Sequence, residues 1–259
     1  MLGDPSDGAT AHAPAPAPAV NALVSVWFPG EGDQYPRLAR VLDYTARLFA
    51  PSWLIRVEAI PRGSLVSRAS QTAMDNSWKL EHWARAVEAA PDGSGVLLLD
   101  TDTFVTAPLD PLWATAFDLA YTVRDAEPFP LNGGVVAVRA NERSREFMWA
   151  WHRRDREMLR DLDLREPWRR RYGGQNQAAL GSLLEGPERE RLHVEKLPCW
   201  EWNCEDLSWR RFGPGTRIVH VHAALRATVF HFGATTPALV PLADLWRRRE
   251  REAIPIRST

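Results

Sequence analysis

The chain has 259 residues, and its apolar fraction of 45% is that of an ordinary globular protein with a sizeable core. Its 32 basic residues nearly balance 33 acidic ones, and a net charge of −1 excludes a molecule-wide basic field for nucleic acid. We therefore expect no nucleic-acid partner. The two cysteines, Cys199 and Cys204, match neither a disulfide framework nor a zinc site, which favours a reducing compartment.

The first residues, 1–19, contain an alternating Ala-Pro stretch and are expected to form a disordered, extended tail. They show no secretion signal and no membrane anchor, and no later apolar run reaches the length of a membrane span. These observations predict a cytoplasmic protein without a transmembrane segment. We expect one domain over residues 20–240, followed by a charged C-terminal helix and tail over 241–259.

Apolar runs and helical periodicity alternate along the first half of the domain. Residues 22–28 predict a buried strand, residues 35–49 a helix, and residues 53–60 a second strand. A further amphipathic helix over 76–90 leads into the apolar run 96–99. This order is typical of an α/β fold with parallel strands, in which sites collect at the carboxyl ends of the strands.

The second half of the chain is less regular. Its periodicity predicts strands over 117–123, 134–140, 192–198 and 217–224, and helices over 142–160 and 176–184. The segment that contains Trp200 and Trp202 is expected to be a loop.

Asp100 and Asp102 follow the apolar run directly, in the stretch LLLDTDTFVT. Two like charges at the end of a buried strand are unfavourable unless a cation neutralises them. Side chains two apart on a strand share a face, and carboxylate oxygens suit Mg²⁺ or Mn²⁺. The pair therefore predicts a metal site and a diphosphate-bearing substrate. Asp161 and Asp163 have the same spacing in a charged helix end, where a solvated surface is expected.

A third metal ligand is expected from the stretch IVHVHAALR. His220 and His222 lie two apart on the predicted strand, so both would face one side. His220 is the favoured ligand and His222 the weaker candidate. The alternative is that one or both only form hydrogen bonds in a half-buried strand.

Taken in order, Lys79, LLLDTDTFV, PLNGGVVAVRAN, NQAAL, LPCWEWN and IVHVHAALR resemble the motifs of GT-A fold glycosyltransferases. The order is most similar to that of glycosyltransferase family 8 and its relatives, over roughly residues 20–235. The resemblance implies a Rossmann-like nucleotide-diphospho-sugar transferase domain with a mixed central sheet. It also implies transfer from a nucleoside diphosphate sugar, usually a UDP-sugar, to an acceptor hydroxyl with Mn²⁺ or Mg²⁺ bound.

The resemblance assigns roles to individual residues. It implies Asp100, Asp102 and His220 as metal ligands, and Lys79 and Arg226 as cations at the diphosphate. The sugar would contact Asn132, Gly133, Gly134 and Gln177, and Val26 and Trp27 of the first strand would line the base pocket. Thr101 and Trp202 are further candidates for substrate contact, and Gln177, Asn176 and Asp125 are the candidate catalytic residues.

The sequence departs from the family at two places. Gly133 stands where the family carries Ser or Thr, and Asn176-Gln177 stands where it usually carries Asp-Gln. An amide hydrogen-bonds a hydroxyl but cannot act as a base. An alternative register takes Gln175 as the matching residue.

The resemblance implies retention at the anomeric carbon, with the leaving phosphate as proton acceptor. An inverting enzyme would instead need a carboxylate base, and the candidates are Asp125, Glu127, Glu205 and Asp206. A role for Trp200 or Trp202 as an acceptor platform is weighed against core packing.

Two rival functions remain open at this point. The first is a sugar-nucleotide-binding protein of weak or lost activity, suggested by Asn176. The second is a phosphatase of the haloacid dehalogenase superfamily, which a test with aryl phosphates would reveal. The basic segments 167–172 and 245–257 could make peripheral contact with a membrane or an anionic acceptor, although a solvated charged face explains them as well.

Overall fold

The computed structural model describes residues 19–30, 34–61, 68–125, 129–230 and 236–253. Its centre is a six-stranded sheet in the order β2-β1-β3-β6-β5-β7, and β4 pairs with β8 in a separate two-stranded ribbon. The strands are β1 (Ala22–Trp27), β2 (Leu54–Ala59), β3 (Gly95–Leu99), β4 (Thr103–Val105), β5 (Leu119–Val123), β6 (Leu131–Arg139), β7 (Val194–Pro198) and β8 (Ile218–His220).

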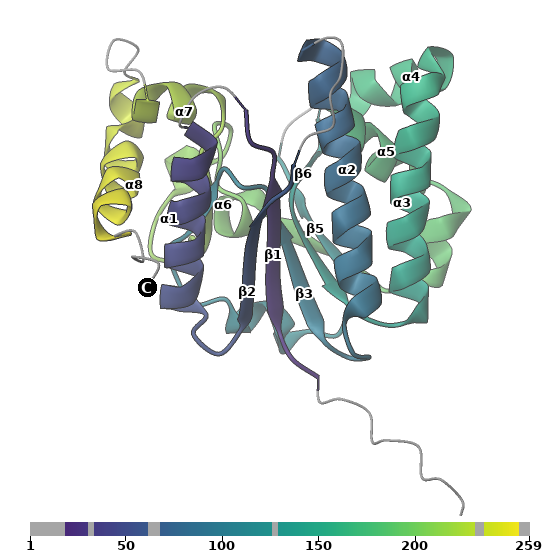
Figure 1. The fold of residues 1–259 in the computed structure, drawn as a ribbon, viewed down its shortest axis with the longest axis horizontal. Helices are drawn as coiled ribbons and strands as arrows, with labels where there is room; N and C mark the ends of the chain where they lie inside the picture. The colour runs from purple at the N-terminus through teal and green to yellow at the C-terminus, as the bar shows by residue number, and fades with distance from the viewer. Residues whose placement is uncertain (1–18, 31–33, 62–67, 126–128, 231–235, 254–259) are drawn as a thin grey trace, which may run out of the picture.

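Helices cover both faces of the sheet (Figure 1). They are α1 (Gln34–Phe49), α2 (Arg68–Ala89), α3 (Glu142–Arg160), α4 (Leu162–Tyr172), α5 (Gln175–Leu184), α6 (Cys199–Trp202), α7 (Ala223–Phe230) and α8 (Val240–Glu252). None of the described helices combines the length and apolar character needed to cross a bilayer.

The central strand β3 is buried on both faces, as expected for a continuous apolar run. Its Val96 and Leu98 join a core cluster with α2, α3 and α5, whereas Leu97 and Leu99 join a second cluster with α1. β3 runs parallel to β1 and antiparallel to β6, so the sheet is mixed. The expected α/β class with a mixed central sheet is confirmed.

A third core cluster anchors the ribbon to α1, α7 and α8. Phe104 of β4 and Val219 of β8 are fully buried in it together with Trp246 of α8. The charged C-terminal segment therefore forms a helix that packs into the protein. This cluster fixes the ribbon, and the ribbon carries the last residues of the site.

Most predicted elements are confirmed, two are wrong, and one helix was not predicted. The strand expected over 217–224 is only β8, because the chain leaves the ribbon after His220 and enters α7. The loop expected around Trp200 is the short helix α6. The helix α4 was not predicted, although Asp163 in its first turn is exposed, as expected for a solvated charged surface. The predicted tail, residues 1–19, lies outside the described residues except for Ala19.

Candidate metal and diphosphate site

The aspartate pair lies in a tight turn between β3 and β4 rather than on a strand, which corrects the sequence prediction. The backbone amide and the hydroxyl of Thr103 both donate to the Asp100 carbonyl, at 3.2 and 2.8 Å. Thr101 points inward instead, and its hydroxyl donates to the Val26 carbonyl at 2.9 Å. The buried Thr101 thus anchors the turn, and the carboxylates of Asp100 and Asp102 on either side of it lie close together.

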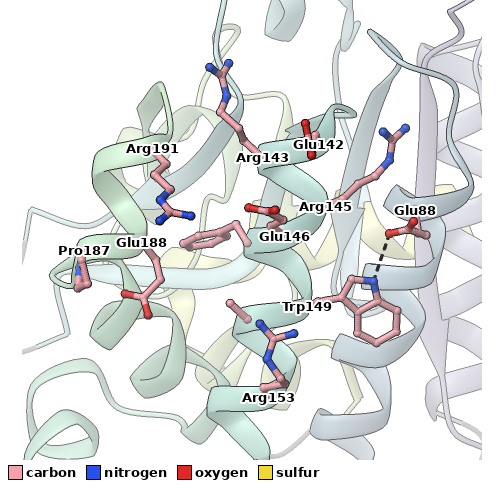
Figure 2. A pocket seen from close by; sticks show the side chains of 12 residues that line it. Glu88, Glu142, Arg143, Arg145, Glu146, Trp149, Arg153, Pro187, Glu188 and Arg191 are labelled. Carbon is pink, nitrogen blue, oxygen red and sulfur yellow. Dashed lines mark hydrogen bonds between the residues drawn. The ribbon is translucent and has the colours of Figure 1, made fainter.

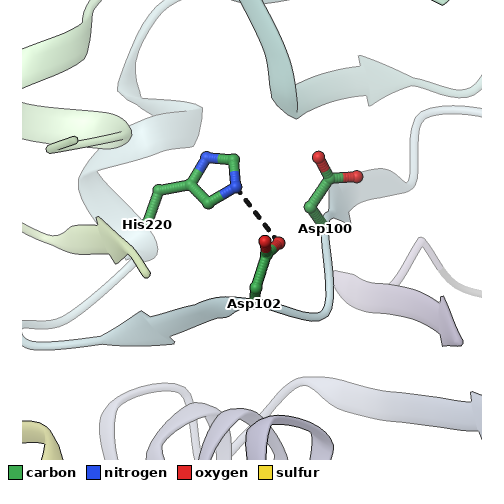
Figure 3. Close-up of side chains that lie close together, drawn as sticks. All are labelled: Asp100, Asp102 and His220. Carbon is green, nitrogen blue, oxygen red and sulfur yellow. Dashed lines mark hydrogen bonds and ion pairs between the residues drawn. The ribbon is translucent and has the colours of Figure 1, made fainter. Parts of the chain in front are cut away.

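His220 reaches the pair because β8 runs antiparallel to β4, with Thr103 and His220 as register partners. The Val221 amide donates to the Asp102 carbonyl at 2.6 Å and locks the two segments together. Ligand atoms of Asp100, Asp102 and His220 all lie within 4.8 Å of one another. Figure 3 shows the imidazole and both carboxylates facing a common space.

A glycine is required beside the imidazole. A Cβ added to Gly134 would lie 2.6 Å from Cε1 and 2.9 Å from Nδ1 of His220, far inside van der Waals contact. The same backbone supports the aspartates, because the Gly134 carbonyl accepts from the Asp100 amide at 2.8 Å. The "NGGV" stretch of β6 therefore leaves space for the imidazole and holds the backbone of Asp100.

Two cationic side chains flank the carboxylates. Lys79, which is only 6% exposed, donates to Asp100 Oδ1 at 2.5 Å and lies over the Trp83 ring. Arg226 Nη2 lies 3.5 Å from Asp102 Oδ2, and its guanidinium lies over the Tyr35 ring. The expected positive charges thus meet the aspartates from α2 and α7.

The pKa values of Asp102 and His220 are shifted by the charges around them. Burial alone would raise the pKa of Asp102, but His220 and Arg226 outweigh it and lower that pKa below its ordinary value. Burial would lower the pKa of His220, and the carboxylates of Asp102 and Asp100 raise it instead. The site therefore favours a positive charge, which a proton on His220 or a divalent cation can supply.

The three side chains fit a hard divalent cation. Two carboxylates and one imidazole leave the remaining positions of an octahedral shell to water or phosphate oxygens, the arrangement that Mg²⁺ and Mn²⁺ accept. His222 does not share this geometry. It lies beyond the end of β8, its side chain is exposed, and its ring centroid is 5.5 Å from that of His220.

The segment expected to contact the sugar lies beside the turn. The Gly133 amide donates to Gln177 Oε1 at 3.0 Å, and Gln177 Nε2 donates to the Tyr172 carbonyl at 2.9 Å. Asn176 is buried at the start of α5, with its side-chain oxygen accepting from the Gln177 amide. Gln175 turns away and donates to the Asp155 carbonyl, which favours the Asn176-Gln177 register.

The remaining donor-site candidates have different environments. Val26 is buried and Trp27 half-buried at the carboxyl end of β1, next to the turn. Trp202 is 4% exposed within the core cluster below α1, so its ring packs as core, while Trp200 is half-buried beside a hollow of about 150 Å³. Sequence reasoning left Trp202 open between these two roles.

The candidate carboxylate bases are mostly engaged. Glu205 is buried and receives two hydrogen bonds from Arg124, at 2.9 and 3.1 Å. Asp206 accepts from two backbone amides at the start of α7. Asp125 has an exposed side chain paired with Arg211, and Glu127 lies outside the described residues.

A larger hollow, about 850 Å³, lies elsewhere. Figure 2 shows it between α3 and the short helix at Pro187–Arg191, near the C-terminal end of α2. That end of α2 leads into the start of β3, whereas the aspartates follow the end of β3. Its lining balances four arginines with four glutamates, which are Arg143, Arg145, Arg153, Arg191, Glu88, Glu142, Glu146 and Glu188. Volume alone therefore does not identify the site.

Sequence reasoning missed one residue of the site. Asn203 is fully buried, and its side-chain oxygen lies 3.0 Å from Nδ1 of His220. It belongs to the LPCWEWN stretch, which carried the resemblance, but nothing in the sequence indicated which histidine nitrogen it would meet.

Neither a protein-family model nor a curated protein matches the chain. Solved structures do match it. Galactosyltransferase LgtC, in complex with donor and acceptor sugar analogs, matches at TM-score 0.57 and 15% identity over 92% of this chain and 98% of that chain. A glycosyltransferase involved in the glycosylation of the major capsid of PBCV-1 matches at TM-score 0.55 and 14% identity over 91% and 99%.

A third match is the glycosyltransferase GlyE of Streptococcus pneumoniae TIGR4, at TM-score 0.58 and 12% identity. It covers 89% of this chain and 60% of that chain. At such identities the likeness establishes the fold. The chain has the GT-A glycosyltransferase fold that the order of its motifs predicts.

Proposed function

We propose that this protein is a metal-dependent glycosyltransferase, which moves a sugar from a nucleoside diphosphate sugar to an acceptor hydroxyl. The observation that carries the proposal is the convergence of Asp100, Asp102 and His220 within 4.8 Å at the end of β3. The GT-A fold makes this edge of the sheet the expected donor site. A UDP-sugar is the proposed donor class, following the resemblance of the motifs.

The charged side chains have distinct tasks in this reaction. Asp100, Asp102 and His220 would hold Mn²⁺ or Mg²⁺, which supplies a Lewis acid for the diphosphate when bound. Lys79 and Arg226, now paired with the two aspartates, would share their charge with the departing phosphate oxygens. The negative charge that develops on the leaving group is thereby offset from several sides.

The bond changes follow from this arrangement. The bond from the anomeric carbon to the diphosphate oxygen breaks with its electron pair on the diphosphate, and the acceptor oxygen bonds to the anomeric carbon. The acceptor proton goes to the leaving diphosphate. Retention is the outcome that the resemblance implies. Of the candidate bases for inversion, Glu205 is held by Arg124 and Asp206 by backbone amides of α7, whereas Asp125 is exposed. The anomeric configuration of the product, read by ¹H NMR, tests this point.

The sugar would lie against the β6 and α5 segments. The Asn132 side chain accepts from the Gly134 amide there, and Gln177 spans from the Gly133 amide to the Tyr172 carbonyl. Gln177→Leu removes both contacts. This substitution is expected to weaken binding of the sugar donor while leaving the cation ligands in place.

A donor screen tests the proposal. The protein is incubated with nucleoside diphosphate sugars, with and without Mn²⁺, and both thermal stabilisation and nucleoside diphosphate release are measured. We expect one donor to stabilise the fold only with the cation present, and to be consumed when an acceptor is added. Asp102→Asn removes the charge at nearly constant shape and should abolish both effects.

Asp163→Asn is the matched control, because Asp163 belongs to an Asp-x-Asp pair of the same spacing on the exposed surface of α4. It should behave as the wild type. Binding of donor and Mn²⁺ without transfer or hydrolysis would establish a sugar-nucleotide-binding protein instead. Absence of any cation-dependent donor would refute the proposed function.

A further inference from the structure

We propose that Asn203 and Thr122 are positioning residues. Through a buried hydrogen-bond chain they hold His220 in the tautomer that carries its proton on Nδ1 and turns the Nε2 lone pair toward the two aspartates. The inference rests on the proposed metal site, because an oriented lone pair serves a cation. Asn203 and Thr122 would thus act through His220, without contact to the sugar donor or the acceptor.

The chain consists of three contacts between buried groups. Thr122 Oγ1 lies 2.7 Å from the carbonyl oxygen of Asn132. The side-chain nitrogen of Asn203 lies 2.9 Å from the same hydroxyl. The side-chain oxygen of Asn203 lies 3.0 Å from His220 Nδ1. Thr122 and Asn203 are fully buried, and Asn132 and His220 are each 4% exposed, so water does not compete for these contacts.

The direction of the chain follows from its far end. A carbonyl oxygen only accepts, so the single hydroxyl proton of Thr122 points to Asn132. The Thr122 oxygen must then accept from Asn203, which requires the NH₂ group on that side. The amide oxygen of Asn203 is left to face His220, and it too only accepts. Nδ1 therefore carries the proton.

This reasoning settles an orientation that is otherwise ambiguous, since the two ends of an amide have nearly the same shape. Asp102 Oδ1 lies 3.1 Å from Nε2 and only accepts, so without a cation it favours a second proton on Nε2. A cation that replaces this proton meets the Nε2 lone pair while Nδ1 keeps its proton. Gly134 lies beside Cε1 and Nδ1, where the side chain of any other residue would collide with the ring in this pose. Outer partners of this kind set both the tautomer and the basicity of a ligating histidine.

The chain also joins two parts of the site. Its last acceptor, the Asn132 carbonyl, belongs to the residue whose side chain accepts from the Gly134 amide at 2.8 Å. The cation ligand and the segment proposed to hold the sugar thus share one rigid group. The position of a cation bound by His220 would therefore be fixed relative to a sugar bound at β6.

The tautomer is directly measurable. Long-range ¹H–¹⁵N spectra of the histidine rings are recorded in cation-free protein and again with diamagnetic Mg²⁺. His220→Gln identifies the resonance of interest among the seven histidines. We expect Nδ1 to be protonated in both spectra and Nε2 to be unprotonated with Mg²⁺ bound. An unprotonated Nδ1 in the cation-free protein would overturn the proposal.

A matched pair of variants separates positioning from simple packing. Thr122→Ser keeps the hydroxyl, whereas Thr122→Val keeps the shape and removes it. Thr122→Val and Asn203→Leu should each weaken Mn²⁺ binding about 10- to 100-fold, and Thr122→Ser should stay near the wild-type Kd. Thr122→Val should also let the amide of Asn203 turn and place proton density on Nε2.

The outcomes distinguish this inference from the proposed function. Unchanged Mn²⁺ affinity in Thr122→Val and Asn203→Leu would refute the positioning roles even if transfer occurs. A wild-type protein that binds no cation would refute the metal-dependent function, and its ring spectrum would still decide the tautomer. Where a variant fails to fold, the wild-type spectrum alone gives the answer.

Discussion

The substitution Gly134→Ala tests the geometry of the site without touching a charge. The new methyl group would lie 2.6 Å from His220 Cε1, so the ring or the strand must shift by roughly 1 Å to reach ordinary contact. The backbone of Gly134 is not left-handed, so alanine brings no φ strain and the effect comes from the methyl group. A displaced imidazole can no longer close on Asp102. We expect Mn²⁺ affinity to fall about 10- to 100-fold and the fold to lose about 1–3 kcal/mol.

The neighbouring glycine provides the control. A Cβ at Gly133 would meet Gln177 Cγ at 3.4 Å, which is tolerable contact, and it lies away from His220. Isothermal titration with Mn²⁺ and urea unfolding are measured on both variants. Gly133→Ala should bind Mn²⁺ as the wild type does. Equal Mn²⁺ affinity in Gly134→Ala and Gly133→Ala would refute the packing argument.

Three further substitutions address other charges. Burial raises the pKa of Asp155 to about 6, so between about pH 4 and 6 the folded protein keeps a proton that the unfolded chain releases, and stability falls as pH rises through that window. Asp155→Asn should therefore raise the free energy of unfolding by about 3 kcal/mol at pH 8, and this difference should disappear near pH 4 in urea titrations. Lys79→Met unpairs Asp100 and should weaken donor binding by about tenfold or more in calorimetry, and unchanged affinity would contradict its phosphate role. Glu205→Gln strands the buried charge of Arg124 and should cost about 3–5 kcal/mol in urea unfolding, a loss that a double substitution to apolar residues should largely recover.

The sequence predicted the elements whose burial pattern is unambiguous. The apolar run of β3 is buried on both faces, and the spacing of Phe147, Met148, Trp151 and Met158 matches the buried side of α3. The aspartate pair was predicted for a physical reason, namely that adjacent carboxylates after a buried strand need a cation. That reason does not depend on whether they lie on the strand or in the turn that follows it.

The end of β8 could not be predicted in the same way. The alternation in IVHVH fits a strand, yet only Ile218–His220 pair with β4, and the next residues turn into α7. Three residues are too few for a periodicity to reveal where pairing stops. His222 was therefore grouped with His220, and the structure separates them.

The helix α4 was hidden by its proline. Pro167 lies inside α4, and a proline removes one helical hydrogen bond, so a sequence pattern does not favour a helix that continues through it. The positioning residues were hidden for another reason. Asn203 lies 81 residues from Thr122 along the chain and meets it only because β5 and α6 pack together. Such partners follow from tertiary structure, and local pattern carries no trace of them.

The central claim is that Asp100, Asp102 and His220 together hold one divalent cation. An electron paramagnetic resonance titration with Mn²⁺ tests it directly, because the spectrum of the free ion is lost on binding. The account predicts one strong site in the wild type and in Asp163→Asn, and a loss of affinity of more than about 100-fold in Asp102→Asn. Equal binding by the wild type and Asp102→Asn, or no strong site in either, would contradict it.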